Sequence, residues 1–378
     1  MWHERTAEAR ERGDLVVVGL IQEQHPDRCR LFLDWQNIDW PILVDSLNRS
    51  GVSAVPLVWA IDEHGVLRHT RPTPEWVLGT FLETAWSAPQ GPSVEPLSCN
   101  EAEKHYLEGR YTESIEAATK HLAEAATDAS MLFLLGCAHR ARYDAHRTTP
   151  THSGMHDSDF QAAIDAWSRA IEAAPSNYIY RRRIQQYGPR LDKPYPFYDW
   201  IAEARDALRK RGADVPRLVV EPEGSELATP VRTHDLAETD DREPDAKHAI
   251  AIDELAIAVH GVVAPNPVRV GSSFRLYWKL RANEGVKLDA EADAPVAWIE
   301  LPNGFTATRK KRMANPVAPT RTPVERTIEY EVHVDAAVEP GSHTIRGYAL
   351  VPICDDATGT CKLVRRSLSR EIVVRAPK

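Results

Sequence analysis

The chain has 378 residues, enough for two or three domains, and its 43% hydrophobic and 27% charged residues are typical of a soluble protein. The net charge of −9 argues against a broad phosphate-binding surface, so no nucleic-acid partner is expected. No apolar run approaches the roughly 18 residues of a membrane helix, and the charged first residues do not form a signal peptide; the chain as written is therefore predicted to be cytoplasmic.

Residues 1–88 alternate helical and strand patterns, which indicates an α/β layer. The continuous apolar run at 15–22 predicts a strand that is buried on both faces. The other expected elements are a helix ended by Gly13, a helix at 26–38, a short strand at 41–45, a hairpin with strands at 56–61 and 66–70, and a helix capped by Thr73.

The stretch GVSAVPLVWAIDEHGVLR, residues 51–68, resembles the TlpA-like and redoxin branch of the thioredoxin superfamily. In that family a strand begins with a cis-proline and ends in Ile-Asp-x-x-Gly. The resemblance implies that the Val55–Pro56 bond is cis and that these two residues present backbone to an extended substrate. An ordinary proline at the start of an edge strand is the alternative. The order of helices and strands around Pro56 favours the family.

The same family carries a redox C-x-x-C on the helix before the strand at 15–22, and a central strand before that helix. Both are absent from the chain as written. A true start further upstream is favoured over a remnant domain, because both flanking strands keep their apolar character, and it would make a periplasmic or extracytoplasmic location possible. Cys29 is the one thiol in this region; Arg28 and Arg30 could favour its thiolate, but a cysteine remote from Pro56 is the favoured interpretation.

Residues 95–212, after a proline-rich linker, are predicted to be helical throughout. Two stretches, 106–122 and 159–175, align with each other. Gly109 fits a repeat that starts near residue 95 and Gly136 fits one that starts at residue 129, a period of 34 residues. Small residues at such positions let two helices approach while an aromatic side chain fills the gap. This pattern resembles tetratricopeptide repeats, which implies protein partners.

Two polar segments interrupt this helical region. An insertion carries side chains that could bind zinc: His146, His152, His156, Asp157 and Asp159. A solvated surface loop is the favoured interpretation, and no metal or cofactor is predicted. A second segment, 181–200, mixes arginines with aromatic residues. It is interpreted as a cover for the end of the helical stack, with a peptide-binding surface as the alternative.

The pattern changes again near residue 220. Residues 220–248 are acidic with few large apolar residues, so they are predicted to be a linker. From 249 to 378 the hydrophobic period becomes two, with turn residues between the runs, which predicts a β-sandwich. The expected fold class is thus multidomain, α/β plus α plus β.

Cys354 and Cys361 stand seven positions apart in the turn-rich stretch YALVPICDDATGTCKL, where a hairpin would bring them within disulfide distance. This stretch resembles the amino-terminal, immunoglobulin-like domain of the thiol:disulfide interchange protein DsbD, which carries two cysteines near its final strands. The loop here is one residue longer, and KLVRR replaces the aromatic and proline residues that follow the second cysteine. A redox pair and a structural disulfide both stay open.

Two functional hypotheses follow. The first is a thioredoxin-family protein of thiol–disulfide exchange, lacking the active dithiol of its thioredoxin-like region in the chain as written; an active form would be a thiol–disulfide oxidoreductase. The second is a non-enzymatic scaffold that uses the helical repeat and the β-sandwich for protein contacts. Protein partners are expected under both hypotheses, and a membrane span under neither.

Overall fold

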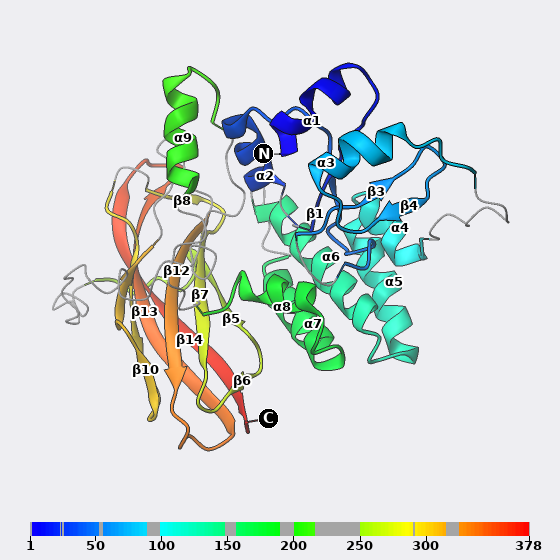
Figure 1. Ribbon diagram of the computed structural model, residues 1–378. Helices are drawn as coiled ribbons and strands as arrows, with labels where there is room; N and C mark the ends of the chain where they lie inside the picture. The colour runs from blue at the N-terminus through cyan, green and yellow to red at the C-terminus, as the bar shows by residue number, and fades with distance from the viewer. Residues whose placement is uncertain are drawn as a thin grey trace. The chain divides into compact units, whose positions relative to one another are not determined.

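The computed structural model describes residues 2–22, 24, 26–52, 56–88, 99–147, 156–189, 200–215, 250–289, 292–314 and 325–377 (Figure 1). The protein mixes helices and sheets and divides into two compact units. The first unit comprises residues 1–100, 177–179 and 200–220, and the second comprises 101–176, 180–199 and 221–378. Most of the helical region thus belongs to the same unit as the β-rich region. The expected division into separate domains at 1–88, 95–212 and 249–378, with a linker at 220–248, stays a prediction.

The first unit contains two small two-stranded sheets. Its elements are α1 (Trp2–Glu11), β1 (Gly19–Ile21), α2 (Asp27–Gln36), β2 (Ile42–Val44), β3 (Ala60–Ile61), β4 (Leu67–His69), α3 (Pro74–Trp76), the π-helix η1 (Val77–Phe81) and α9 (Trp200–Lys210). Strand β1 pairs with β2 in parallel, and β3 pairs with β4 in antiparallel. Among the described residues, no strand joins these two sheets.

The strand expected at 15–22 is shorter and more exposed than its sequence predicts. Only Gly19–Ile21 is a strand, and Val16 and Val18 are 76% and 48% exposed. The prediction of burial on both faces was therefore wrong for the described structure. The physical reason is that both faces of a strand are buried only where other elements pack over them, and the described elements leave these side chains uncovered.

The local signals in the first unit are confirmed. Gly13 adopts a φ of +79° just after α1, as a helix-ending glycine does. In the turn between β3 and β4, the Asp62 carboxylate accepts hydrogen bonds from the backbone N–H groups of His64 and Val66, both at 2.9 Å, and Gly65 has a φ of +77°. The Thr73 hydroxyl accepts a hydrogen bond of 3.3 Å from the Trp76 N–H, which caps α3.

Helix α9 packs against α2 within the first unit. The indole rings of Trp35 and Trp200 are stacked, with centroids 6.0 Å apart and planes at 4°. Arg211 donates hydrogen bonds of 2.9 Å to the Trp35 carbonyl oxygen and to the Asn37 side chain. The last helix of the expected helical region therefore belongs to the first unit rather than to the helices before it.

The second unit begins with consecutive helices. They are α4 (Glu101–Leu107), α5 (Tyr111–Glu124), α6 (Ala129–Arg147) and α7 (Asp159–Ala173), followed by α8 (Tyr178–Gln185), whose first two residues belong to the first unit. Gly136 in α6 faces the fully buried Trp167 of α7. This is the small-against-aromatic packing that the sequence predicts. The aromatic residues after α7 also pack inward, with Tyr187 stacked on Trp167 at 5.6 Å between centroids.

The β-rich part of the second unit contains two sheets around one hydrophobic core. One sheet has the order β10 (Phe305–Ala307), β12 (Glu325–Val334), β7 (Ser273–Ala282), β5 (Ile257–Ala264). The other has the order β11 (Lys311–Met313), β9 (Val296–Glu300), β13 (Gly341–Asp355), β14 (Cys361–Arg375), β6 (Val268–Arg269), with β8 (Val286–Leu288) also paired to β13. Both sheets contribute to the core, for example Trp278 and Val351. The prediction of an all-β region here is confirmed.

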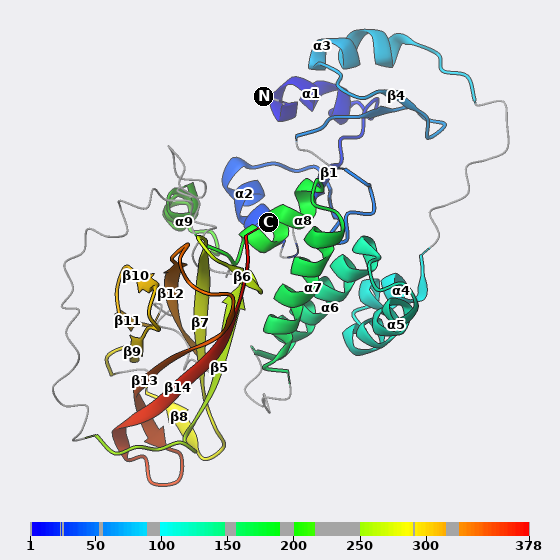
Figure 2. The same ribbon diagram turned by 90° about the horizontal axis from the view of Figure 1, so that it is seen from below.

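Helices α6 and α7 and the residues after α8 contact the four-stranded sheet (Figure 2). The Gln161 side chain accepts a hydrogen bond of 2.9 Å from the Val263 N–H, and its amide donates to the Val263 carbonyl oxygen at 3.3 Å. The Tyr143 hydroxyl donates to the Glu325 carboxylate at 3.0 Å. On the six-stranded sheet, Val351 and Ile353 of β13 point into the core, so Cys354 and its partner Cys361 lie on the opposite face. In the described parts of the chain, no helix is long and apolar enough to span a bilayer.

Candidate functional site

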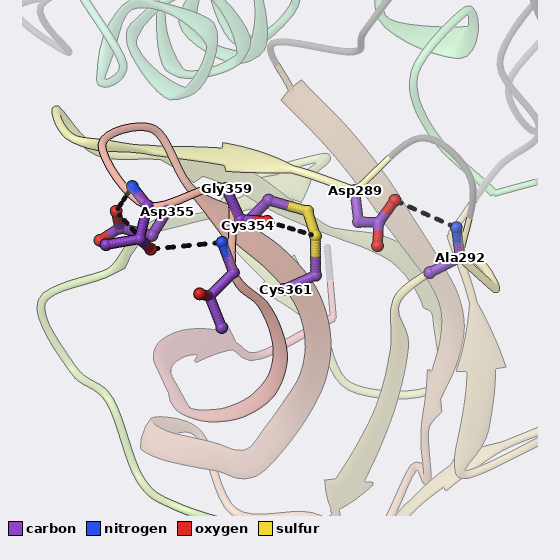
Figure 3. Close-up of a disulfide and its surroundings, with 8 residues drawn as sticks. Asp289, Ala292, Cys354, Asp355, Gly359 and Cys361 are labelled. Atoms are coloured by element: carbon purple, nitrogen blue, oxygen red, sulfur yellow. Dashed lines mark hydrogen bonds between the residues drawn. A yellow bond between two sulfur atoms is a disulfide. The ribbon is translucent and has the colours of Figure 1, made fainter.

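The long hairpin of β13 and β14 brings Cys354 and Cys361 together. Its antiparallel register places the two cysteines directly opposite each other, at the last pair before the turn. They form a disulfide with a Cα–Cα distance of 4.0 Å (Figure 3). The two cysteines are seven positions apart because one turn separates them: β13 ends just after Cys354, and β14 begins at Cys361.

An aspartate organises the turn that follows Cys354. The Asp355 carboxylate accepts hydrogen bonds from the Ala357 N–H at 3.0 Å and from the N–H and hydroxyl of Thr358 at 2.8 and 3.1 Å. These bonds, the one from the Thr358 N–H first, lower the pKa of Asp355. The turn therefore has its own hydrogen bonds and does not depend on the disulfide alone.

The two cysteines differ in their access to solvent. Cys354 is 5% exposed, whereas Cys361 is an exposed residue. Cys361 also lines a pocket of about 500 Å³, together with Asp289, Ala292, Asp293, Ala294, Val296, Lys311, Leu350, Pro352, Lys362 and Leu363. An incoming thiolate would meet the Cys361 side of the bridge, with apolar and charged side chains around it.

Asp289 lies beside the disulfide, just beyond the end of β8 (Figure 3). One carboxylate oxygen and the two sulfur atoms all lie within 4.8 Å of one another. The Asp289 N–H donates to the Pro352 carbonyl oxygen at 3.1 Å, and the carboxylate accepts a hydrogen bond of 3.2 Å from the Ala292 N–H. Sequence analysis missed this residue, because the pairing of β8 with β13 joins segments about 65 positions apart.

The other predicted substrate-binding residues belong to the first unit. Pro56 is described and exposed, but it lies four residues before β3 and does not open that strand, and Val55 lies outside the described residues. The Val55–Pro56 bond is therefore also outside them, and its cis geometry stays a prediction. The described cis bonds are Ala264–Pro265 and Asn266–Pro267, both in the second unit, and sequence analysis did not predict them.

The remaining thiols and histidines do not form a comparable cluster in the described structure. Cys29 is half-buried on α2, and burial raises the pKa of the fully buried Cys137 thiol. Of the proposed zinc-binding set, His152 lies outside the described residues. Asp159 instead pairs with Arg142 at 2.7 Å and with His139 at 2.7 Å. The group of metal-ligating side chains found within the described ranges is Asp289, Cys354 and Cys361.

Comparisons with known proteins do not identify a family. No family model matches the chain, and no curated protein matches it. Among solved structures, AggA, the major subunit of aggregative adherence fimbriae type I from Escherichia coli, is 17% identical with a TM-score of 0.19, covering 33% of this chain and 99% of AggA. BcpA, the major pilin subunit of Bacillus cereus, is 9% identical with a TM-score of 0.20, covering 31% of this chain and 39% of BcpA. Similarities this low carry no argument about fold or function.

Proposed function

We propose that the protein takes part in thiol–disulfide exchange through the Cys354–Cys361 bridge. The observation that carries this proposal is the asymmetry of the bridge: Cys361 is exposed and lines a pocket, whereas Cys354 is buried. Exchange requires that one sulfur be accessible to an attacking thiolate, while the other serves as the leaving group. The hairpin turn supports this use, since its own hydrogen bonds would hold the strands together after the bridge opens.

The proposed reaction proceeds in two exchanges with a partner dithiol. A thiolate of the partner attacks Cys361 Sγ, a mixed disulfide forms, and Cys354 leaves as a thiolate that takes up a proton. The second thiol of the partner then attacks the partner's sulfur atom in the mixed disulfide and releases the Cys361 thiol. Two electrons pass from the partner to this protein, and the partner becomes a disulfide. The pocket lining carries two lysines, Lys311 and Lys362, and two aspartates, Asp289 and Asp293, so the charges around the bridge nearly balance.

Sequence resemblances support a partner of the thioredoxin type. The region around Cys354 and Cys361 resembles the immunoglobulin-like domain of DsbD, and residues 51–68 resemble the thioredoxin superfamily. The parallel pair β1–β2 and the hairpin β3–β4 are compatible with a thioredoxin-like region at 1–88, and the packing of Gly136 against Trp167 is compatible with tetratricopeptide-like helices. We include in the same proposal that the β-rich part of the second unit has an immunoglobulin-like topology.

The test is to trap the mixed disulfide with the full chain. The chain carries Cys29→Ser and Cys99→Ser, which removes the half-buried and exposed free thiols. It is mixed with a reduced thioredoxin whose resolving cysteine has been replaced, then acid-quenched, alkylated and analysed by peptide mass spectrometry. We expect an adduct on Cys361 and none on the matched double variant Cys354→Ser/Cys361→Ser. A chain that yields no adduct, or one on Cys354 instead, contradicts the proposal.

The scaffold hypothesis predicts a different result from the same variants. A bridge that closes so short a loop contributes stability on the order of 2–3 kcal/mol. If no adduct forms and Cys354→Ser lowers the free energy of unfolding by about that amount, the bridge is structural, and the scaffold hypothesis is favoured. Denaturant unfolding of the oxidised chain and of Cys354→Ser, measured in the same background, gives this difference.

A further inference from the structure

The side chains around the disulfide include more metal-binding donors than exchange requires. Two sulfur atoms and one carboxylate oxygen lie within 4.8 Å of one another, on the neighbouring segments β8, β13 and β14. Thiolate and carboxylate are both zinc ligands, with Zn–S about 2.3 Å and Zn–O about 2.0–2.2 Å. A tetrahedral ion at those distances needs donors about 3.5–3.8 Å apart. Once the sulfurs are no longer bonded to each other, they must move apart to reach that spacing, while the carboxylate oxygen already lies within 4.8 Å of both.

We propose that the reduced Cys354 and Cys361 thiolates, with the Asp289 carboxylate, form a zinc site that disulfide formation abolishes. The pocket beside Cys361 leaves room for water as the fourth ligand. This inference rests on the proposed function only in requiring that the bridge can be reduced; it requires no protein partner to remain bound. It extends that function by giving the dithiol form a ligand of its own.

Charge explains why the reduced site would favour a cation. Opening the bridge would free two sulfur ligands next to the Asp289 carboxylate, and negative charges gathered this closely repel one another unless a cation lies between them. A divalent ion reverses this effect, because it stabilises all three anions and displaces the thiol protons to solvent. In the disulfide form neither sulfur can act as an anionic ligand, so only the carboxylate remains and the ion is released.

Either a dithiol or a phosphine can reduce the bridge; a phosphine takes its oxygen from water, becomes a phosphine oxide and leaves two thiols. A dithiol supplies two electrons and two protons, becomes a disulfide, and leaves Cys354 and Cys361 as thiols. Zinc then binds with the release of up to two thiol protons, and reoxidation of the pair by a disulfide reverses both steps. Zinc has no redox chemistry here and serves as a ligand-bound ion.

The experiment uses the full chain in the Cys29→Ser/Cys99→Ser background. The chain is reduced with a water-soluble phosphine, freed of reductant without oxygen, and titrated with zinc against a chromophoric chelator. We expect one more zinc ion per reduced chain than per oxidised chain. Cobalt should produce sulfur-to-cobalt charge-transfer absorption in the reduced chain alone. Equal zinc binding by both forms, or cobalt spectra without that absorption, overturns the proposal.

Matched variants separate the carboxylate from the thiols. Asp289→Asn should weaken zinc binding by more than about tenfold, since even residues that only support a metal ligand are worth about 10- to 100-fold. Asp293 lines the same pocket without belonging to the three-donor cluster, so Asp293→Asn should leave the zinc affinity unchanged. Equal affinities for wild type and Asp289→Asn contradict a three-donor site. Circular dichroism of each oxidised variant, in which the bridge is intact, checks folding.

The outcomes distinguish this inference from the proposed exchange. Phosphine reduction needs no protein partner, so zinc binding can be observed even if no mixed disulfide is trapped. A trapped mixed disulfide together with no zinc binding leaves the exchange standing and removes the metal site.

Discussion

Asp159 shows how one buried carboxylate organises its surroundings. Its side chain accepts hydrogen bonds from Arg142 at 2.7 and 2.8 Å and from His139 at 2.7 Å, and His156 lies 3.5 Å away. Burial by itself would raise the pKa of Asp159, but the bonds from His139 and Arg142 outweigh burial, and the net effect is a lowered pKa. The carboxylate is therefore a structural ion-pair centre at the start of α7.

Replacing Asp159 by asparagine should lower the free energy of unfolding by about 2 kcal/mol or more at pH 7, because bonds to a charged group are worth about 1.5–3 kcal/mol. A carboxylate whose pKa is lowered by folding stabilises the protein above its ordinary pKa and loses this effect as the pH falls through the lowered value. The difference between wild type and Asp159→Asn should therefore be full above about pH 5 and shrink below it.

Denaturant unfolding at a series of pH values measures this difference. Asp206→Asn is the control, since Asp206 forms an exposed pair with Arg209 on α9 and should change stability by less than about 0.5 kcal/mol. A difference for Asp159→Asn that is constant from pH 7 to pH 3 would falsify the ion-pair role.

At the scale of the elements, the contact between α6 and α7 depends on a glycine. A Cβ atom added at Gly136 would overlap the indole ring of Trp167, which is fully buried and stacked on Tyr187. In an isolated helix, Gly→Ala is favourable by about 1 kcal/mol. In this helix pair the clash should dominate, because inserting a methyl group into a packed core costs about 1–3 kcal/mol.

We therefore expect Gly136→Ala to lower the free energy of unfolding by about 1–3 kcal/mol, measured by denaturant unfolding. Gly188→Ala is the control in the same unit, because the nearest atom to its added Cβ would be the Ile184 carbonyl oxygen at 3.5 Å, an ordinary contact. Adding Trp167→Leu to Gly136→Ala should recover part of the loss relative to the sum of the single changes. Wild-type stability in Gly136→Ala would mean that these helices do not depend on close approach.

At the scale of the whole molecule, the helices and the four-stranded sheet share a buried polar interface. Gln161 bonds to both backbone groups of Val263, and its side-chain oxygen also accepts a hydrogen bond of 2.9 Å from Arg370. The Tyr277 hydroxyl donates to the Tyr187 carbonyl oxygen at 2.6 Å. Such an interface couples the stability of both parts, because opening it exposes buried groups on each side.

The helices and the β-rich part should therefore unfold in a single calorimetric transition, and Gln161→Ala should lower the midpoint temperature of that transition. The expected loss is about 1–3 kcal/mol, since the change leaves buried donors and acceptors without their partner. Glu116→Ala, at an exposed position of α5, is the control and should leave that transition unchanged. Two separate transitions, only one of which responds to Gln161→Ala, would contradict coupled folding of the second unit.

Local sequence signals by themselves determined much of the fold. The change of hydrophobic period marked where helices end and strands begin, because burial on one face repeats every 3.6 residues in a helix and every two in a strand. Turn and cap residues act over a few positions, so the roles of Asp62 and Thr73 were predictable. The exposure of the apolar run at 15–22 was not, since the burial of a strand depends on the elements that pack over its faces, which local sequence does not specify.

Only the tertiary structure decided which polar faces are buried and what surrounds the disulfide. In β7 the alternation of apolar and polar residues predicts a solvent face, yet Arg275 and Lys279 are 2% and 4% exposed. The helices that pack on this sheet cover that face, and both buried charges have partners on β12: Arg275 pairs with Glu329 at 2.5 Å, and Lys279 donates to the Thr327 hydroxyl at 2.9 Å. Asp289 approaches the sulfurs through the register of β8 on β13, and register between distant segments is set by packing of the whole domain.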